Sequence, residues 1–180
     1  MKLLITGGTV FVSRTLAAYF LAQGQEVYVL NRNTRPQVPG VRLIQGDRHD
    51  LKDCLKGYRF DAVVDTGYTR RDVTELLEAL GDYGTFLFIS SSAVYPETTP
   101  QPLRERAAAG YNAIWKQYGM DKAEAEQALQ QRDPQAYILR PPYLYGPGNN
   151  VYREAFDWDQ THRDQVNRKP LTAFIDRNFR

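Results

Sequence analysis

The sequence predicts an α/β protein with a parallel β-sheet that is covered by helices on both faces. Short apolar segments with little alternation recur through residues 1–140, and segments with helical spacing of apolar residues separate them. Parallel strands buried on both faces have almost continuously apolar sequences, so this pattern favours a doubly wound sheet. The 180 residues are enough for one such domain with a sizeable core.

The strands are expected, in chain order, at residues 2–6 (KLLIT), 26–31 (EVYVLN), 41–46 (VRLIQG), 61–67 (DAVVDTG), 85–92 (TFLFISSS) and 136–142 (AYILRPP). Helices are expected at residues 11–23, 51–56, 73–80 and 111–131. Gly24 and Gly81 follow the first and third helices, and glycine is typical of helix ends. The last helix is long and rich in strong helix formers.

The composition argues against several classes of protein. The 23 basic and 21 acidic side chains give a net charge of +2, which provides no strong footprint for nucleic acid. Cys54 is the one cysteine, so a reducing compartment is expected. No secretory leader is expected from the first residues, and no apolar segment approaches the roughly 20 residues of a membrane span. His49 and His162 form no metal-ligand pattern. We therefore expect a cytoplasmic protein without a metal or a membrane partner.

The loop after the first strand, TGGTVFVS, has the form of a phosphate-binding turn between a strand and a helix. Glycine lets the backbone approach a ligand closely, and the amides of a helix N-terminus favour a diphosphate. Val10 and Ser13 stand where such turns usually carry glycine, so a tight turn without a ligand remains the alternative. The predicted cofactor contacts in this loop are Gly7, Gly8, Thr9, Val10, Phe11 and Val12.

The second strand ends where a dinucleotide fold meets the adenosine ribose. An acidic residue there would accept a hydrogen bond from the ribose 2′-hydroxyl, but this chain has Asn31 followed by Arg32. A guanidinium suits a 2′-phosphate, which predicts a preference for NADP over NAD. The alternative is a solvated turn with ordinary arginines.

Tyr118 and Lys122 are four residues apart in the long helix and therefore lie on one of its faces. An ammonium near a phenol favours the phenolate and lowers the phenol pKa, which prepares the tyrosine for proton transfer. Tyrosine and lysine also meet at this spacing by chance in many helices. The serines that end the fifth strand support the catalytic interpretation, because hydroxyls at a strand C-terminus face the ligand crevice.

Four motifs occur in a recognisable order: TGGTVF, SSSAVY, YGMDK and LRPPYLYGPGN. Together they resemble the extended short-chain dehydrogenase/reductase family, in its NAD-dependent epimerase/dehydratase branch. The resemblance covers roughly residues 1–150. A subgroup of the family that carries TGGTxF lacks the middle glycine and keeps the fold, so the loop is expected to remain a cofactor loop with altered pyrophosphate packing.

The resemblance implies a Rossmann domain at residues 1–150 that binds NAD or NADP. Ser91 matches the catalytic hydroxyl, four residues before the tyrosine of SSAVY. Tyr118 matches the catalytic acid and base, and Lys122 matches the lysine that holds the nicotinamide ribose and lowers the tyrosine pKa. The other implied cofactor contacts are Asp47 near the adenine, Thr66 and Gly67 after the fourth strand, and Pro142 and Tyr143 beside the nicotinamide.

The implied function is oxidoreductase chemistry with NAD(P) in the epimerisation, dehydration or reduction of a nucleotide sugar or a related carbonyl or alcohol substrate. Family members continue much further after YGPGN and build a substrate domain there. Residues 151–180 are expected to be a short charged remnant of that domain, so slow or no turnover and a homodimer or partner chain are expected. A non-catalytic NAD(P)-binding module or sensor is the alternative, and RNA binding, known for some TGGTxF relatives, is a less favoured one.

Overall fold

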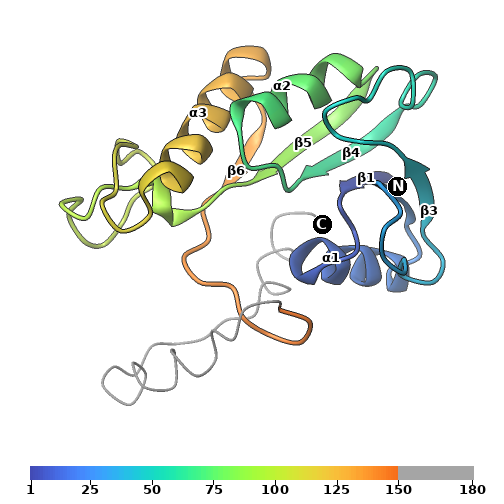
Figure 1. Cartoon of the computed structure of the whole chain (residues 1–180), viewed down its shortest axis with the longest axis horizontal. Helices are drawn as coiled ribbons and strands as arrows, with labels where there is room; N and C mark the ends of the chain where they lie inside the picture. Colours follow the sequence, from blue (N-terminus) through green and yellow to red (C-terminus); the bar gives the residue numbers. More distant parts are fainter. Residues whose placement is uncertain (150–180) are drawn as a thin grey trace. The chain divides into compact units, whose positions relative to one another are not determined.

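In the computed structural model, which describes residues 1–149, six strands form one parallel sheet in the order β3-β2-β1-β4-β5-β6 (Figure 1). The strands are β1 (Lys2–Thr6), β2 (Glu26–Asn31), β3 (Arg42–Gln45), β4 (Phe60–Asp65), β5 (Tyr83–Ile89) and β6 (Tyr137–Leu139). The strand order reverses between β1 and β4. This is the Rossmann-like doubly wound sheet predicted from the sequence, and such sheets bind ligands at the carboxyl ends of the strands beside the reversal.

The chain divides into two units, Met1–Leu144 and Tyr145–Arg180. The first unit contains the whole sheet. In the second unit, the amide of Asn149 donates to the carbonyl of Gly146 at 3.2 Å and closes a turn. The charged segment expected at residues 151–180 lies outside the described residues.

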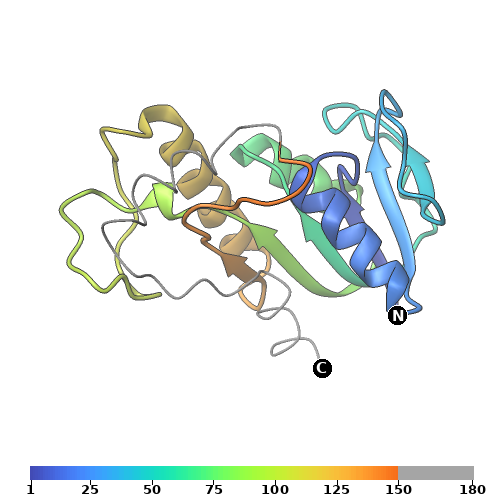
Figure 2. The same ribbon diagram turned by 90° about the horizontal axis from the view of Figure 1, so that it is seen from below.

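Helices cover both faces of the sheet, as Figures 1 and 2 show. The helix α1 (Phe11–Ala22) lies on one face, and α2 (Arg70–Ala79) and α3 (Lys116–Arg132) lie together on the other. A single 3₁₀ turn, η1 (Ser92–Val94), follows β5. No helix within residues 1–149 is long and apolar enough to cross a membrane.

The largest core cluster lies between the sheet and the α2–α3 pair. Leu4 and Val63 from adjacent strands pack there with Leu76 of α2 and Leu129 of α3, and all four are fully buried. Because side chains alternate along a strand, Leu3 and Ile5 point to the opposite face, which α1 covers with Leu16 and Phe20. Both faces of the central strands are thus apolar, which explains their unbroken apolar sequences.

Several elements differ from the prediction, and three of these differences bear on the site. Residues 51–56 form turns and no helix, although Leu51 and Leu55 still enter the core. Strand β5 ends at Ile89, so Ser90 and its neighbours follow the strand. The long helix begins at Lys116 and not at residue 111. The reason is Asn112, whose side-chain oxygen accepts from the amides of Ile114 and Trp115 and holds them in a turn.

Candidate functional site

The predicted site residues gather at the carboxyl edge of the sheet, where β1, β2, β4 and β5 end next to the reversal of strand order. The glycine loop follows β1, Asn31 ends β2, Thr66 follows β4 and Ser91 follows β5. Because the strands are parallel, all of these positions lie at one edge.

The loop between β1 and α1 requires both of its glycines. Gly7 and Gly8 have φ of 87° and 82°, a region that L side chains rarely adopt. A Cβ on Gly8 would also lie 2.5 Å from Cγ1 of Val29. The loop therefore passes directly over β2, and the Gly7 amide donates to the carbonyl of Leu30 at 2.9 Å.

Ser13 fits the position where related turns carry a third glycine. Its hydroxyl donates to the carbonyl of Val10 at 3.0 Å, and the side chain is buried. A Cβ on Gly7 would lie 3.0 Å from Ser13 Oγ, so the serine fills the space between helix and loop. The serine substitution preserves the close contact between α1 and the glycine turn.

The two helices that begin at this edge differ at their N-termini. Helix α2 has a capping box, in which Thr69 accepts from the Asp72 amide and Asp72 accepts from the Thr69 amide. The N-cap of helix α1 is Val10, an extended residue whose side chain has no acceptor and makes no capping bond. The first amides of α1 therefore lack the side-chain cap that α2 has, and a diphosphate is the kind of group that satisfies such amides.

Asn31 is already engaged in hydrogen bonds. Its amide nitrogen donates to the Gly7 carbonyl at 2.5 Å and to Gln37 Oε1 at 3.1 Å. Its oxygen accepts from the Asn33 amide at 2.8 Å and from Gln37 Nε2 at 3.1 Å. Asn31 therefore joins the glycine loop to the segment after β2, and it can bind a ribose only by exchanging one of these partners.

Arg32 lies close to Asp47, the residue predicted to contact the adenine. Its Nη1 atom is 4.0 Å from Oδ2 of Asp47, and both side chains are largely exposed. The Asp47 carboxylate also accepts from the His49 amide at 2.9 Å. An exposed pair at this distance contributes little to stability, so the guanidinium is held only loosely.

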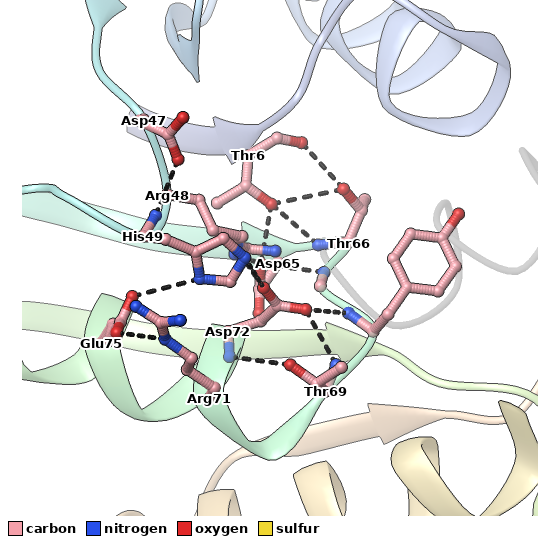
Figure 3. Close-up of polar contacts among 12 residues, drawn as sticks. Thr6, Asp47, Arg48, His49, Asp65, Thr66, Thr69, Arg71, Asp72 and Glu75 are labelled. Atoms are coloured by element: carbon pink, nitrogen blue, oxygen red, sulfur yellow. Dashed lines mark hydrogen bonds and ion pairs between the residues drawn. The ribbon is translucent and has the colours of Figure 1, made fainter. Parts of the chain in front are cut away.

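A buried network joins β1 to β4 at the reversal of strand order, as Figure 3 shows. The Thr6 hydroxyl donates to Asp65 Oδ1 at 2.7 Å and accepts from the Thr66 amide at 2.8 Å. The Thr66 hydroxyl donates to the Thr6 carbonyl at 3.0 Å. Arg48 pairs with the fully buried Asp65, whose Oδ2 atom has no hydrogen-bond partner among residues 1–149. The side chain of Thr66 thus serves mainly to tie the two strands together.

Asp72 links this network to the surface of α2 (Figure 3). It lies 3.7 Å from Arg48 Nε and 3.4 Å from His49 Nε2. Burial opposes its ionisation, but the amide and hydroxyl hydrogen bonds of Thr69, the Tyr68 amide and the charge of Arg48 outweigh burial and lower the pKa of the Asp72 carboxyl. Asp72 is thus an ionised carboxylate that fixes the turn after β4.

The turn after β5 brings Ser91 next to α3. The Ser91 hydroxyl accepts from the Ala93 amide at 3.1 Å and caps η1. Helix α3 packs against η1 through Gly119, where an added Cβ would lie only 2.3 Å from the Ala93 carbonyl oxygen. Gly119 directly follows Tyr118, so this close approach brings the backbones that carry Ser91 and Tyr118 together. The neighbouring Ser90 hydroxyl is buried and has no partner within the described residues.

Lys122 projects from α3 into the carboxyl edge of the sheet. Its ammonium donates to the Gly67 carbonyl at 2.6 Å and to the Ile89 carbonyl at 2.7 Å. It also lies 4.9 Å from the ring centroid of Tyr68 and 4.8 Å from that of Phe88. Burial lowers the pKa of Lys122 to about 8, although the charge of Asp65 opposes the shift.

Tyr118 belongs to a row of aromatic rings. Its ring centroid lies 6.0 Å from that of Tyr68 and 6.1 Å from that of Trp115, and Trp115 lies 6.2 Å from Tyr143. The predicted nicotinamide residues Pro142 and Tyr143 follow β6, which is hydrogen-bonded to β5. Contacts among aromatic rings therefore connect Tyr118 to Tyr143 through Trp115, and connect Tyr118 through Tyr68 to the Lys122 ammonium.

Several residues of this edge are not predicted from the sequence: Arg48, Asp65, Tyr68 and Gly119. Two of them carry a signal in the sequence. Asp65 is a carboxylate at the end of an apolar strand, and such a group needs a buried partner. Gly119 interrupts a run of strong helix formers between Tyr118 and Lys122, and a glycine there usually marks a close packing contact.

Similarity to known proteins identifies the family of this chain. Residues 3–162 match the model of the NAD dependent epimerase/dehydratase family. The match covers most of the chain, and the chain belongs to this family.

Individual relatives match most of this chain but only part of their own length. The chain is 30% identical over 176 residues to the chloroplast stem-loop binding protein of 41 kDa b from Arabidopsis thaliana, covering 87% of this chain and 45% of that protein. A solved UDP-galactose 4-epimerase superposes with a TM-score of 0.74 at 20% identity, covering 92% of this chain and 64% of that one. A short-chain dehydrogenase/reductase superfamily protein from Agrobacterium tumefaciens with bound NAD gives a TM-score of 0.58 at 27% identity, covering 78% and 48%. The chain thus spans less than two thirds of each of these relatives.

Proposed function

We propose that this chain binds NAD or NADP at the carboxyl edge of the sheet and acts as an epimerase, dehydratase or reductase on a nucleotide sugar or a related carbonyl or alcohol. The observation that carries the proposal is the N-terminus of α1. Gly7 and Gly8 lead into it with positive φ, and no side chain caps it. A diphosphate fits there because it accepts from the uncapped helix amides, and glycine lets the backbone approach it closely.

The side chains at this edge suit proton transfer beside the cofactor. Bound nicotinamide would supply hydride transfer to and from a substrate carbon. Tyr118 would take the proton from the substrate hydroxyl as that carbon is oxidised and return it on reduction. Ser91 accepts from the Ala93 amide and keeps its own hydrogen to donate to the same substrate oxygen.

Lys122 supports this role through its charge. Two of its three ammonium hydrogens are donated to the Gly67 and Ile89 carbonyls. The third hydrogen would be donated to a ribose hydroxyl. The ammonium would also favour the phenolate form of Tyr118, which lies one turn away on α3.

Binding and turnover are tested separately. Titration calorimetry with NAD and NADP tests the cofactor site, and a panel of UDP-, GDP- and dTDP-sugars assayed for epimerisation, dehydration and reduction tests the chemistry. Absence of binding at millimolar NAD and NADP would overturn the proposal. Binding without turnover on any substrate would favour the non-catalytic module or sensor.

We further propose a preference for NADP, because no carboxylate lies at the end of β2 and Arg32 is exposed and weakly held beside Asp47. The Asn31 oxygen also supports this preference, because it already accepts two hydrogen bonds and is not free to accept one from the 2′-hydroxyl of NAD.

We also propose that the chain self-associates through the exposed aromatic side chains near the site, which include Tyr68. Analytical ultracentrifugation tests this proposal.

Binding of an RNA stem-loop is a second candidate. The relative at 30% identity is named a stem-loop binding protein. Exposed aromatic side chains at Tyr68 and Tyr111 could stack on unpaired bases. Gel-shift titration with a stem-loop RNA and with a duplex of equal length tests this function, and equal weak binding of both would count against it.

A further inference from the structure

Tyr68 contacts the predicted catalytic residues but has no part in the chemistry proposed above. Its backbone is fixed, because its amide donates to Asp72 Oδ2 at 2.8 Å and the preceding carbonyl, that of Gly67, accepts from Lys122 at 2.6 Å. Its side chain is 59% exposed. The ring can therefore turn about its own side-chain bonds without disturbing the core or the backbone.

The groups around the Lys122 ammonium differ in how freely they can move. The carbonyls of Gly67 and Ile89 belong to the backbone at the ends of β4 and β5. Phe88 lies fully buried in the core. Tyr68 is the exposed side chain of this set, yet Lys122 itself is only 3% exposed. Among these groups, only the Tyr68 ring can leave the ammonium without breaking the sheet or the core.

We propose that Tyr68 is a positioning residue that controls access to Lys122: its ring covers the ammonium, and a ligand hydroxyl reaches Nζ only when the ring turns away. The identification of that ligand as a cofactor ribose rests on the proposed function. The ring also contacts Tyr118, with centroids 6.0 Å apart, so the same movement changes the packing around the catalytic tyrosine. An ammonium is attracted to the face of an aromatic ring, which favours the covered arrangement.

Chemical modification of Lys122 tests, without any cofactor, whether the Tyr68 ring blocks access to the ammonium. Acetic anhydride is applied to the folded chain, and the acetylation rate of Lys122 is normalised to that of exposed Lys52 by peptide mass spectrometry. Tyr68→Ala should accelerate acetylation of the neutral Lys122 amine, obtained from the pH dependence of the rate, by about fivefold or more, equivalent to about 1 kcal/mol, which is within the range of one cation–π contact. Tyr68→Phe should leave the rate unchanged, because it keeps the ring.

The matched control is Tyr111→Ala, which removes another exposed tyrosine. Circular dichroism melting verifies that each variant is folded, and Tyr68→Leu provides a second variant without the ring. An unchanged Lys122 rate in the folded ring-less variants would overturn the proposal. Equal acceleration in Tyr111→Ala would overturn it as well.

Cofactor titration separates this proposal from the proposed function. If the ring must leave before the ribose binds, Tyr68→Ala should bind NADP about fivefold more tightly than the wild type. Absence of binding in all variants would overturn the cofactor site, while faster acetylation in Tyr68→Ala would still support the cover. Equal affinity in the wild type and Tyr68→Ala, with equal acetylation, would overturn the cover and leave the cofactor site standing.

Discussion

Substitution of Gly119 by alanine tests whether the close contact between α3 and η1 positions the catalytic residues. The new Cβ would lie 2.3 Å from the Ala93 carbonyl oxygen and 3.2 Å from the Ala93 carbonyl carbon. Both groups are backbone, so no side chain can turn aside. Restoring an ordinary contact requires α3 and η1 to separate by about 1 Å, since dispersion contacts are optimal at about 3.5–4 Å.

Two opposing effects set the expected change in stability. Alanine in a helix interior is more favourable than glycine by about 1 kcal/mol. Overpacking of a close contact costs about 1–3 kcal/mol. Gly119→Ala should therefore lower the free energy of unfolding by about 0–2 kcal/mol. At a helix position without such a close contact, the same substitution would raise the free energy of unfolding by about 1 kcal/mol.

The effect on turnover should be larger than the effect on stability. Ser91 lies two residues before Ala93, and Tyr118 lies next to Gly119, so separation of the elements moves the two hydroxyls apart. A misplacement of about 1 Å can lower the rate by about 100-fold. Cofactor affinity should change far less, because the glycine loop after β1 is not involved.

Urea denaturation measures the free energy of unfolding, and steady-state kinetics on the substrate found in the sugar panel measure turnover. Gly81→Ala is the control for a milder backbone contact away from the site, because the new Cβ would lie 3.3 Å from the Tyr58 carbonyl oxygen. A Gly119→Ala chain that is about 1 kcal/mol more stable than the wild type and equally active would refute the contact and the reasoning built on it.

Three further predictions follow from ionised side chains. Burial lowers the pKa of Lys122 from 10.5 to about 8, so the unfolded chain binds more protons between these pH values. Over this window the wild-type free energy of unfolding should rise by about 3 kcal/mol relative to that of Lys122→Met, and parallel urea-derived curves for the two proteins would contradict this. Glu126→Gln should cost about 3–5 kcal/mol by urea denaturation, because it removes the buried carboxylate that pairs with Arg140, whereas the double variant Glu126→Leu/Arg140→Met should cost much less. Arg32→Ala should weaken NADP binding about tenfold more than NAD binding in calorimetric titrations, with Arg42→Ala as the control; an unchanged affinity ratio would exclude the 2′-phosphate contact.

The fold was predictable because the apolar pattern depends on burial alone. Segments such as KLLIT and EVYVLN are apolar on both faces and become β1 and β2 with the expected bounds. The long helix was extended too far because residues 111–115 have acceptable helix propensity, while the deciding interaction is tertiary. The Asn112 amide donates to the Tyr95 carbonyl at 2.7 Å, and its oxygen then holds the next amides in a turn.

The site was only partly predictable for a similar reason. Chain spacing identifies Tyr118 and Lys122, because both lie on one helix face. Spacing cannot show that the Lys122 ammonium is held by carbonyls 33 and 55 residues earlier, or that Arg48 pairs with Asp65 across 17 residues. Partners of this kind depend on which strands become neighbours, and that order emerges only from the folded sheet.

The central place of β1 has a consequence for synthesis of the chain. β1 is made before the other strands of the sheet, yet it pairs on one side with β2 and on the other with β4, whose last residue is Asp65. Until β4 has left the ribosome, one edge of β1 has no partner in the final sheet, and its fully buried residues Leu4 and Ile5 lack part of their cover. Unpaired apolar edges are sites of aggregation. A nascent chain that pauses before β4 has left the ribosome should therefore depend on chaperones.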